Sequence, residues 1–498
     1  MKRSLYILII ISALLSVAIP ARAQMPIKLS VADTVPPDTA DLAYYGKKHF
    51  WRASAELVGF NLSLWAFDRY VQKGDFSYIS FKTIAENFKH GFKWDNDKLG
   101  TNMFLHPYTG NLYYNTGRSN GFNFWQSSLY AIAGSAMWEL FMECEYPSTN
   151  DIIATPIGGI AIGEVAYRAS DAVLDDRATG WSRFGREAGA FVINPMRGLT
   201  RILNGDAWRH RPTSGKQFGT PNVGVEFSIG PKAIEFRHDG VNDYKIGGCI
   251  DFNMEYGDRF EVHSKLPYDY FTVHANLNVI ASQPVLSQLT ITGRLLAREL
   301  LDSRQKQDLS LGIYQHFDYF DSDTISRQHH KCPFKLGVPA SIGVGMMYRN
   351  MEHPRTTFDA YAHFNAVLLG SILSDYYHLD ERNYNWAMGM SGKVGIQAVW
   401  GGDKYCISLS TALYRLYTFK GYPQGTDMRT ADRRLLNAMG DHSEATFGIT
   451  QLSAQMRLHD HLYLGLEAAH YYRATHYRDF PHVNSSTFTQ SLKLIYKL

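Results

Sequence analysis

From about residue 221 to the C-terminus, apolar and polar residues alternate along the chain with a period of two. The segment FTVHANLNV, residues 271–279, places its apolar side chains at odd positions and its threonine, histidine and asparagines at even ones. Residues 223–229, 405–413 and 488–498 repeat this pattern. Because successive side chains of a strand point to opposite faces, the period predicts strands with one apolar and one polar face.

The number and length of these segments favour a barrel that spans a membrane. A strand needs roughly 9 to 11 residues to cross a bilayer at a tilt, and barrels of this kind have an even number of strands. Twelve segments fit, at residues 221–230, 244–257, 268–281, 286–299, 307–319, 335–349, 356–370, 388–400, 403–419, 443–458, 461–475 and 485–498.

The connections between the segments alternate in length. GGD at 401–403 and HDH at 459–461 are short turns, whereas residues 320–334, 371–386 and 420–442 are long polar loops. Short periplasmic turns and longer external loops are typical of outer-membrane barrels. We therefore predict an antiparallel up-and-down transmembrane β-barrel of about 12 strands over residues 216–498. The alternative is a soluble β-sandwich with one polar face, which does not account for the loop asymmetry.

The first half of the chain has a helical pattern instead. Apolar segments at 51–71, 124–145 and 151–176 and an amphipathic one at 186–205 predict a helical domain over residues 47–215, acting as a plug or periplasmic cap. Gly159 and Gly163 have the GxxxG spacing that lets a second backbone approach closely. Residues 24–46, with Pro36-Pro37 and several Asp and Thr, predict an extended leader.

The N-terminus indicates export. Lys2 and Arg3 precede an apolar run, and Ala21-Arg22-Ala23 offers the small residues of a signal-peptidase site, which predicts a signal peptide over residues 1–23. A retained membrane anchor is the alternative, but the run is short for a span. We expect the mature protein in the outer membrane of a Gram-negative cell envelope, in contact with phospholipid and lipopolysaccharide.

The amino-acid composition excludes further classes of protein. Charged residues make up 19% of the chain and the net charge is +3, which argues against a nucleic-acid partner. Aromatic residues reach 14%, and the four cysteines are too few for a disulfide framework in a chain of 498 residues. No cofactor or metal is expected from any motif; His329-His330 with Cys332 are a candidate metal group in a long loop, where solvated surface is the simpler interpretation.

Two stretches carry a resemblance. HPYTGNLYYNTGRSNGFNFW at 106–125 and SAMWELFMECEYPSTNDIIATPIGGIAIGE at 135–164 contain His-Pro-Tyr-x-Gly, Arg-x-x-Gly, Trp-Glu, Pro-Ser-x-x-Asp and Gly-Glu in that order. This pattern is similar to the signature of the domain of unknown function (DUF) 3943 family of Gram-negative outer-membrane proteins. The resemblance covers roughly residues 90–170. It implies the architecture predicted above and no established activity.

The same stretches hold the candidate chemistry. Glu139 and Glu143 share one face of a helix, and His106, Asp151 and Glu164 are candidates to converge on them. An imidazole with several carboxylates suits general acid/base hydrolysis or a metal site. Arg118, with Lys93 or Lys98, could hold a lipid phosphate or carboxylate. We find neither a His-x-x-x-His pair nor a Gly-x-Ser-x-Gly elbow.

A structural interpretation of the polar cluster competes with the catalytic one. Buried polar groups need partners, and Glu139 pairing with Arg118, or Asp151 capping a helix, would satisfy that need without catalysis. His-Pro at 106–107 would end one segment and open the next, so that 106–125 forms a turn-rich aromatic connection.

Three functions therefore stay open. The favoured one is a non-enzymatic envelope or plugged-channel protein. The second is a hydrolase that modifies phospholipid or lipopolysaccharide through His106 with Glu139 and Glu143. The third is an assembly barrel whose helical half docks a periplasmic partner.

Overall fold

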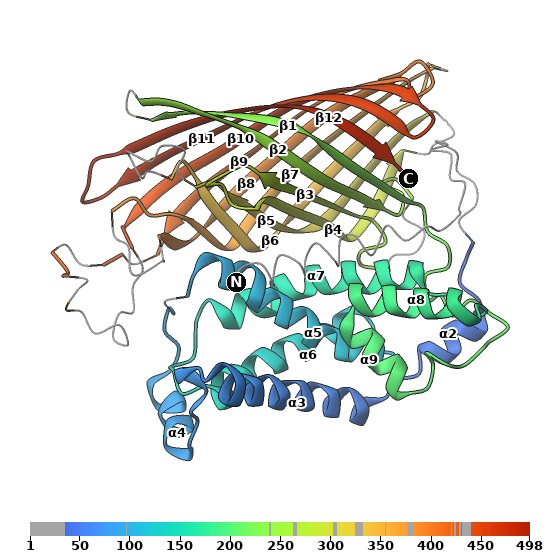
Figure 1. The fold of residues 1–498 in the computed structure, drawn as a ribbon, viewed down its shortest axis with the longest axis vertical. Coiled ribbons are helices and arrows are strands. Elements are labelled where there is room, and N and C mark those ends of the chain that lie inside the picture. Colours follow the sequence, from blue (N-terminus) through green and yellow to red (C-terminus); the bar gives the residue numbers. More distant parts are fainter. Residues whose placement is uncertain are drawn as a thin grey trace. The chain divides into compact units, whose positions relative to one another are not determined.

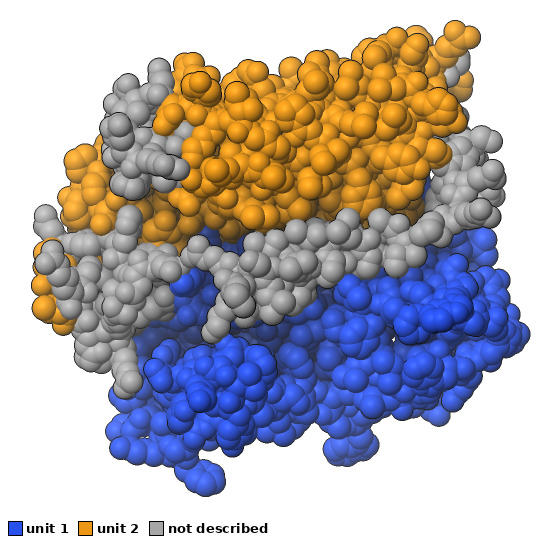
Figure 2. All heavy atoms as spheres, viewed as in Figure 1, with its two compact units in different colours: residues 1–222 blue, residues 223–498 orange. Residues whose placement is uncertain are grey.

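The computed structural model divides the chain into two compact units, Met1–Asn222 and Val223–Leu498 (Figure 2). The boundary lies slightly beyond the predicted one at residues 215 and 216. The signal segment and residues 24–34 of the leader lie outside the described residues. The structure describes residues 35–95, 97–238, 241–261, 266–301, 306–323, 332–353, 355–376, 383–419, 421–422, 425–427, 430 and 440–498.

The second unit is a closed antiparallel barrel of twelve strands, each paired with the next along the chain and β1 paired with β12 (Figure 1). This confirms the predicted fold and strand number. The strands are β1 (Val223–His238), β2 (Val241–Tyr256), β3 (Phe271–Val279), β4 (Leu286–Leu301), β5 (Gln307–Asp321), β6 (Lys335–Asn350), β7 (Thr356–Leu373), β8 (Tyr384–Trp400), β9 (Tyr405–Thr418), β10 (Ser443–His459), β11 (Leu462–Tyr477) and β12 (Val483–Lys497).

The two faces of the strands follow the period-two pattern. On β9, Ile407, Leu409 and Leu413 are exposed on the outside, whereas Tyr414 and Leu416 are buried. The register of strand pairing keeps the same face outward on neighbouring strands. Outward residues pair with outward ones, as Leu409 does with Ile396 of β8. The barrel therefore turns an apolar surface outward all along this part of its wall.

Strand bounds differ from the prediction by a few residues at several places, and two parts of the barrel differ most. β1 continues past Pro231 to His238, although the sequence predicted that it would end near residue 230. Pairing of β1 with β12 is interrupted at Gly230 and Pro231, where proline has no N–H to donate, while pairing with β2 continues. The connection between β2 and β3 is long, although it lies at the end where short turns were expected; side-chain contacts described below hold it.

In the first unit, the described segments of regular secondary structure longer than an isolated bridge are helices. The part of the chain that the structure describes contains no helix both long and apolar enough to cross a membrane. The elements of the first unit are α2 (Thr39–Tyr45), α3 (Phe50–Phe67), η1 (Asp68–Gln72), η2 (Asp75–Ser77), α4 (Phe81–His90), η3 (Thr101–Leu105), α5 (His106–Ser119), α6 (Phe124–Met137), η4 (Trp138–Met142), α7 (Asp151–Val173), α8 (Gly180–Ile193) and α9 (Pro195–Leu203).

The extended leader is wrong for residues 39–45, which form α2. Asp38 caps this helix by accepting a hydrogen bond from the N–H of Ala40 at 2.7 Å. The Asp41 carboxylate then accepts from the Thr213 hydroxyl at 2.6 Å and the Gly215 N–H at 2.8 Å. These partners are far along the sequence, so no local pattern could indicate them.

The turn-rich connection predicted at 106–125 is also wrong, because residues 101–119 form one continuous helix, η3 followed by α5. Its glycines serve close packing rather than turns. A Cβ on Gly110 would lie 1.8 Å from the Thr155 carbonyl oxygen of α7, and one on Gly159 would lie 2.4 Å from the Gly110 carbonyl carbon. The backbones of α5 and α7 therefore touch at these two glycines.

The predicted helix at 186–205 is two helices, α8 and α9. Asn194 ends α8 and caps α9, its side chain accepting from the Arg197 N–H at 3.0 Å. Pro195 occupies the first position of α9, where a missing N–H has no cost.

Candidate functional site

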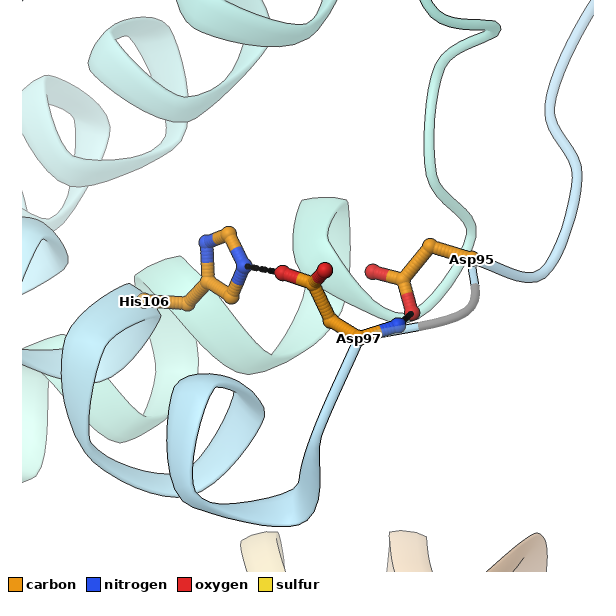
Figure 3. A group of neighbouring side chains, drawn as sticks. All are labelled: Asp95, Asp97 and His106. Carbon is orange, nitrogen blue, oxygen red and sulfur yellow. Dashed lines mark hydrogen bonds and ion pairs between the residues drawn. The ribbon is translucent and has the colours of Figure 1, made fainter. Parts of the chain in front are cut away.

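His106 lies where the helix of residues 101–119 passes from a π-helical to an α-helical turn. The next residue, Pro107, has no N–H for the helix ladder, and a widened turn accommodates that loss. The imidazole faces the loop that holds Asp95 and Asp97 (Figure 3). Its Nε2 lies 3.3 Å from Asp97 Oδ2 and 3.6 Å from Asp151 Oδ1. Asp97 is half exposed, so the group opens to solvent on one side.

The Asp95 carboxylate is fixed by the segment that precedes α7. Its Oδ2 accepts from the Ser148 hydroxyl at 3.2 Å and from the Asn150 amide at 2.8 Å, and its Oδ1 accepts from the Asp97 N–H at 3.2 Å. Asn150 also donates to Asp151 Oδ1 at 2.9 Å. The Pro-Ser-x-x-Asp part of the family signature thus binds a carboxylate that the sequence analysis did not select.

Glu139 lies in η4, a second π-helical turn, and is buried. Its Oε2 accepts from the Ser148 N–H at 2.6 Å. Burial raises the pKa of Glu139 to about 7, against the opposing effect of that hydrogen bond. Burial, together with the neighbouring Glu139 charge, raises the pKa of Glu143 well above its usual range. The two carboxyl groups therefore hold protons at pH values where exposed glutamates are ionised.

Charge within the group favours a protonated His106. Burial alone would lower the pKa of His106, but the hydrogen bond and charge of Asp97 and the charges of Asp95 and Glu139 raise it above its ordinary value. Burial and the Asp95 charge raise the pKa of Asp151 well above its usual range. Asp95, which receives several hydrogen bonds, has its pKa lowered despite burial. The group can thus exchange protons near neutral pH.

Asp95, Asp97 and His106 also offer one ligand atom each within 4.8 Å of one another. One imidazole nitrogen and carboxylate oxygens are donors that divalent cations accept. These three residues are where a metal would be held, and two of them were missed by the sequence analysis. The signal that could have found them is the Asp-x-Asp spacing shortly before the His-Pro pair.

The structure brings four of the predicted residues together, His106, Glu139, Glu143 and Asp151, and places the other two elsewhere. Glu164 of α7 is fully buried and accepts two hydrogen bonds from Arg118, at 2.8 and 3.0 Å. Arg168 donates to the same carboxylate at 2.9 Å and Tyr114 at 2.7 Å. Burial would raise the pKa of Glu164, but the two guanidinium groups lower it.

The predicted pairing of Glu139 with Arg118 is therefore wrong. Arg118 forms an ion pair with Glu164, and its guanidinium carbon lies 4.4 Å from the centre of the Tyr167 ring. It does not join Lys93 in a phosphate site, since the Lys93 ammonium lies over the Tyr146 ring at 4.5 Å. His329 and His330 lie outside the described residues, so the loop metal group stays a prediction.

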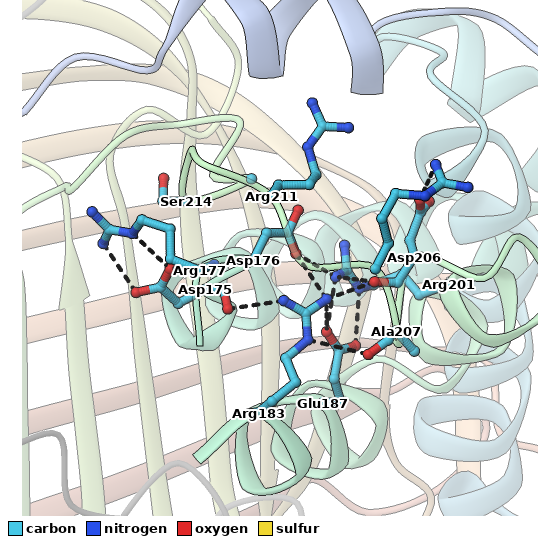
Figure 4. A network of polar contacts seen from close by, with 12 residues as sticks. Asp175, Asp176, Arg177, Arg183, Glu187, Arg201, Asp206, Ala207, Arg211 and Ser214 are labelled. Carbon is cyan, nitrogen blue, oxygen red and sulfur yellow. Dashed lines mark hydrogen bonds and ion pairs between the residues drawn. The ribbon is translucent and has the colours of Figure 1, made fainter. Parts of the chain in front are cut away.

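A second buried ion network joins α8 and α9 (Figure 4). Asp176 binds Arg201 at 2.7 Å and Arg183 at 3.1 Å. Glu187 binds the same two arginines, at 2.8 and 2.9 Å. Arg183 also donates to the carbonyl oxygen of Ala207 at 3.1 Å. Each charge in this network has an opposite partner, which is the condition for burying it at acceptable cost.

The barrel lumen is filled at the long-loop end by the barrel's own side chains. Phe334, from the connection between β5 and β6, stacks on inward-facing Tyr471 with ring centres 4.7 Å apart. Arg473 donates to the Pro333 carbonyl at 2.9 Å and to Asp375 at 2.7 and 2.9 Å. A cluster of buried apolar residues surrounds them, comprising Phe320, Leu336, Val338, Val367, Ile372, Ala387, Tyr414, Leu416, Ala445, Phe447 and Ile449.

At the opposite end, the described residues of the connection between β2 and β3 pack against the barrel strands. Phe260 packs with Tyr270, Tyr314 and Met347. Buried Arg294 of β4 holds this connection, since it donates to Asp269 at 2.6 Å and to the carbonyl oxygens of Arg259 at 2.9 Å and Glu261 at 2.7 Å.

Between the two ends, inward-facing ion pairs occupy the lumen. Lys393 lies 2.7 Å from both oxygens of Asp318. Lys493 lies 2.9 Å from Asp251 and 2.8 Å from Glu467. Paired charges of the described residues therefore lie between the two packed ends of the barrel.

The observations define a closed, twelve-stranded antiparallel barrel protein with an N-terminal helical unit. Within that unit, residues 91–196 match the family model of the Domain of unknown function (DUF3943). The matched range contains the His106 group and the Arg118–Glu164 pair. No curated protein matches the chain.

Several solved barrels are distantly similar. The translocator domain of autotransporter NalP from Neisseria meningitidis is 10% identical, over 61% of this chain and 95% of that one, with a TM-score of 0.24. The Pseudomonas putida toluene transporter TodX is 7% identical over 55% and 89%, with a TM-score of 0.22. The anion-selective porin from Comamonas acidovorans is 8% identical over 56% and 100%, with a TM-score of 0.21. At these values the fold rests on the strand pairing of this chain itself.

Proposed function

We propose that this chain is an outer-membrane β-barrel protein whose lumen is closed by its own side chains, a non-enzymatic envelope or plugged-channel protein. A closed barrel leaves no unpaired strand edge, which is the condition for a β-structure to stand in lipid. The exposed Leu, Ile, Val and Met side chains on the outer face of β6 to β12 support a lipid environment. The predicted signal peptide supports the same location.

The observation that supports the closed state is that buried side chains cluster at both ends of the barrel and paired charges lie between them. The Arg294 contacts are the most specific part of it, because one guanidinium group binds two backbone carbonyls and one carboxylate of the inward-folded connection. A guanidinium held in this way gives the connection a fixed geometry.

Conductance across a planar bilayer tests the proposal. We expect the wild-type protein to show no sustained ion current, and Arg294→Gln to show frequent openings because the connection between β2 and β3 is released. Arg298→Gln is the matched control, since Arg298 lies on the same strand and is exposed. A large steady current through the wild-type protein would overturn the closed state.

Location is tested separately. The mature protein should fractionate with the outer membrane and migrate differently on gels before and after boiling, because a closed barrel resists detergent until heated. Both variants should keep this heat-modifiable band if they fold. Recovery of the wild type in the soluble periplasm would overturn the membrane assignment.

A second candidate function is lipid hydrolysis at the His106 group. The specific observation in its favour is the 3.3 Å contact of His106 Nε2 with Asp97, beside carboxyl groups whose pKa values are raised by burial. Such a pair can act as general acid and base. Lipid mass spectrometry of a deletion strain, complemented with wild type or with His106→Ala, decides it. A lipid species restored only by the wild type would favour the hydrolase over the envelope role.

A further inference from the structure

The helical unit exposes a continuous apolar surface on α8, α9 and the residues that follow. Trp181 is 87% exposed, Trp208 74% and Leu203 64%. We call this the α8–α9 face; its residues are Trp181, Phe184, Phe191, Val192, Leu199, Ile202, Leu203 and Trp208. So many large apolar side chains are rarely exposed together on a water-facing domain, so they mark a contact with an apolar partner.

The face contains a groove of about 590 Å³. Phe184, Phe191, Ile202 and Trp208 form its walls, and Arg183 and Glu187 line it as well. Those two charges are already paired with each other at 2.9 Å. An apolar ligand in the groove therefore needs no charged group to pair with Arg183 or Glu187.

The groove is rigidly built. A Cβ on Gly198 would lie 2.4 Å from Phe191 Cδ2, so α9 approaches α8 closely through this glycine. Beneath it, Asp176, Glu187, Arg183 and Arg201 bind the two helices together. Arg183, Glu187 and Arg201 point into this network, and large apolar side chains of both helices are exposed.

The charges at the edge of the face are basic. Arg209 is half exposed and His210 is exposed, both directly after Trp208. The acidic residues of the same segment are turned inward, Glu187 onto Arg201 at 2.8 Å and Asp206 to within 3.4 Å of Arg209. Tryptophan beside a cation, with apolar residues between, is the composition of a helix that lies in a membrane interface.

The length of the chain between α9 and β1 also limits how far the α8–α9 face can lie from the barrel. Leu203 ends α9 and Val223 begins β1, so at most about 70 Å of extended chain separates the face from the barrel. This step rests on the proposed function, in which the barrel stands in a bilayer. A surface tethered in this way meets lipid at high effective concentration.

We propose that the α8–α9 face binds the surface of a lipid leaflet with anionic headgroups. One acyl chain occupies the groove, Trp181 and Trp208 lie at the level of the headgroups, and Arg209 and His210 lie near the lipid phosphates. The helical unit is thereby a peripheral membrane domain that touches lipid independently of the barrel wall.

Photo-crosslinking in the full-length protein tests this proposal. The protein is reconstituted in nanodiscs of phosphatidylethanolamine and phosphatidylglycerol, with p-benzoylphenylalanine replacing Phe184 or Leu203. Lys82, exposed on α4, is the control position in the helical unit, and Leu452, exposed on β10, is the control in the barrel. We expect lipid adducts at positions 184, 203 and 452 and few at position 82.

The outcomes separate the two proposals. Adducts at 452 without adducts at 184 and 203, or crosslinks from those two positions to protein only, would overturn the lipid face and leave the barrel assignment standing. Absence of lipid adducts at 452 would overturn the barrel assignment. Equal yields at 82 and 184 would overturn the specificity of the face.

A charge variant supplies a second readout. Arg209→Gln should lower the yield of phosphatidylglycerol adducts at position 184 about fivefold relative to the parent probe, because a cation near an anionic surface contributes roughly that much to binding. Arg177→Gln is the matched control, since Arg177 is an exposed arginine paired with Asp175 at 2.9 Å and does not itself line the groove. An unchanged yield would overturn the assignment of the headgroup contact to Arg209.

Discussion

The helical unit and the barrel both bury ion pairs and both expose large apolar side chains, yet they reach this arrangement by different routes. In the barrel, alternate residues of a strand face opposite sides, so Ser408 points inward and Leu409 outward by geometry alone. In the helical unit, Glu164 is neutralised by Arg118, 46 residues away along the chain. In the barrel, the inward and outward positions follow from the local sequence. In the helical unit, the pairing of buried charges depends on tertiary contacts.

That difference determines which substitutions destabilise each unit. A barrel residue can be exchanged with little effect if its face is respected, because many neighbours share its role. A helical ion network has few members, each with a specific partner, and loss of one leaves a buried charge without compensation. The predictions below test this contrast.

The largest effect is expected for Glu164→Gln. Removal of this charge leaves the Arg118 and Arg168 guanidinium groups buried without their shared carboxylate, at a cost of about 3–5 kcal/mol in the unfolding free energy of the helical unit. Urea titration of the helical circular dichroism signal in the full-length protein measures it. Glu86→Gln, at a half-buried site on α4, should change stability by about 0.5 kcal/mol or less. A similar small loss for both variants would contradict the network.

The next effect tests the barrel faces with substitutions one residue apart. Leu409→Lys places a charge on the outer face of β9 and should cost about 2–4 kcal/mol if that face is in lipid. Ser408→Lys places the same charge on the inner face, beside Ser453, and should cost less. Refolding equilibria into lipid vesicles compare the two. Equal costs would mean that the two faces share one environment.

The third effect is a pH dependence in the helical unit. The pKa of Glu139 is about 7 in the folded protein, against an ordinary 4.5, so between those values the folded state holds a proton that the unfolded chain has lost. Stability must therefore fall as pH rises through this window, by up to about 3 kcal/mol. The raised pKa values of Glu143, Asp151 and His106 act in the same direction.

Glu139→Gln should flatten this slope, since the amide oxygen can still accept from the Ser148 N–H. The variant should therefore match the wild type near pH 5 and exceed it near pH 8, whereas pairing with Arg118 would have made the substitution destabilising. Urea titrations at the two pH values measure the difference. Parallel pH profiles for wild type and variant would refute the raised pKa of Glu139.

The smallest effect concerns two helix glycines. Gly159→Ala forces α5 and α7 apart and should cost about 1–3 kcal/mol. Gly185→Ala on α8 meets open space and should stabilise the unit by about 0.5–1 kcal/mol, because alanine is the better helix former. Thermal unfolding of both variants reports the sign. A gain at both positions would mean that the two helices are not in backbone contact.

The same contrast explains what could be predicted from the sequence. The strand number and the faces were predictable because a period of two fixes both. The strand end that differs most from its prediction is that of β1, which continues past Pro231, where pairing breaks on one side only. In the helical unit the apolar helices were predictable and their partners were not. Glycine and asparagine in residues 106–125 suggested turns because close helix packing needs the same small residues that turns do.

The candidate site was half predictable for a related reason. His106, Glu139 and Asp151 could be selected as residue types that suit one chemistry. Asp95 joins them only because a loop folds back onto Ser148 and Asn150. No spacing rule relates positions 95 and 150, so the hydrogen bonds that hold Asp95 had to come from the structure, although the Asp-x-Asp spacing could have drawn attention to the residue.

The Arg294 contacts have a consequence for the order of assembly. They link residues 259–261 and 269 to strand β4 within a span of 36 residues, whereas the seam between β1 and β12 joins Glu226 to Lys497 across nearly the whole barrel. Contacts between residues close in sequence form earlier and more readily than distant ones. The contacts that hold the connection between β2 and β3 are therefore expected to form before β1 pairs with β12, which makes closure of the barrel the later event in its folding.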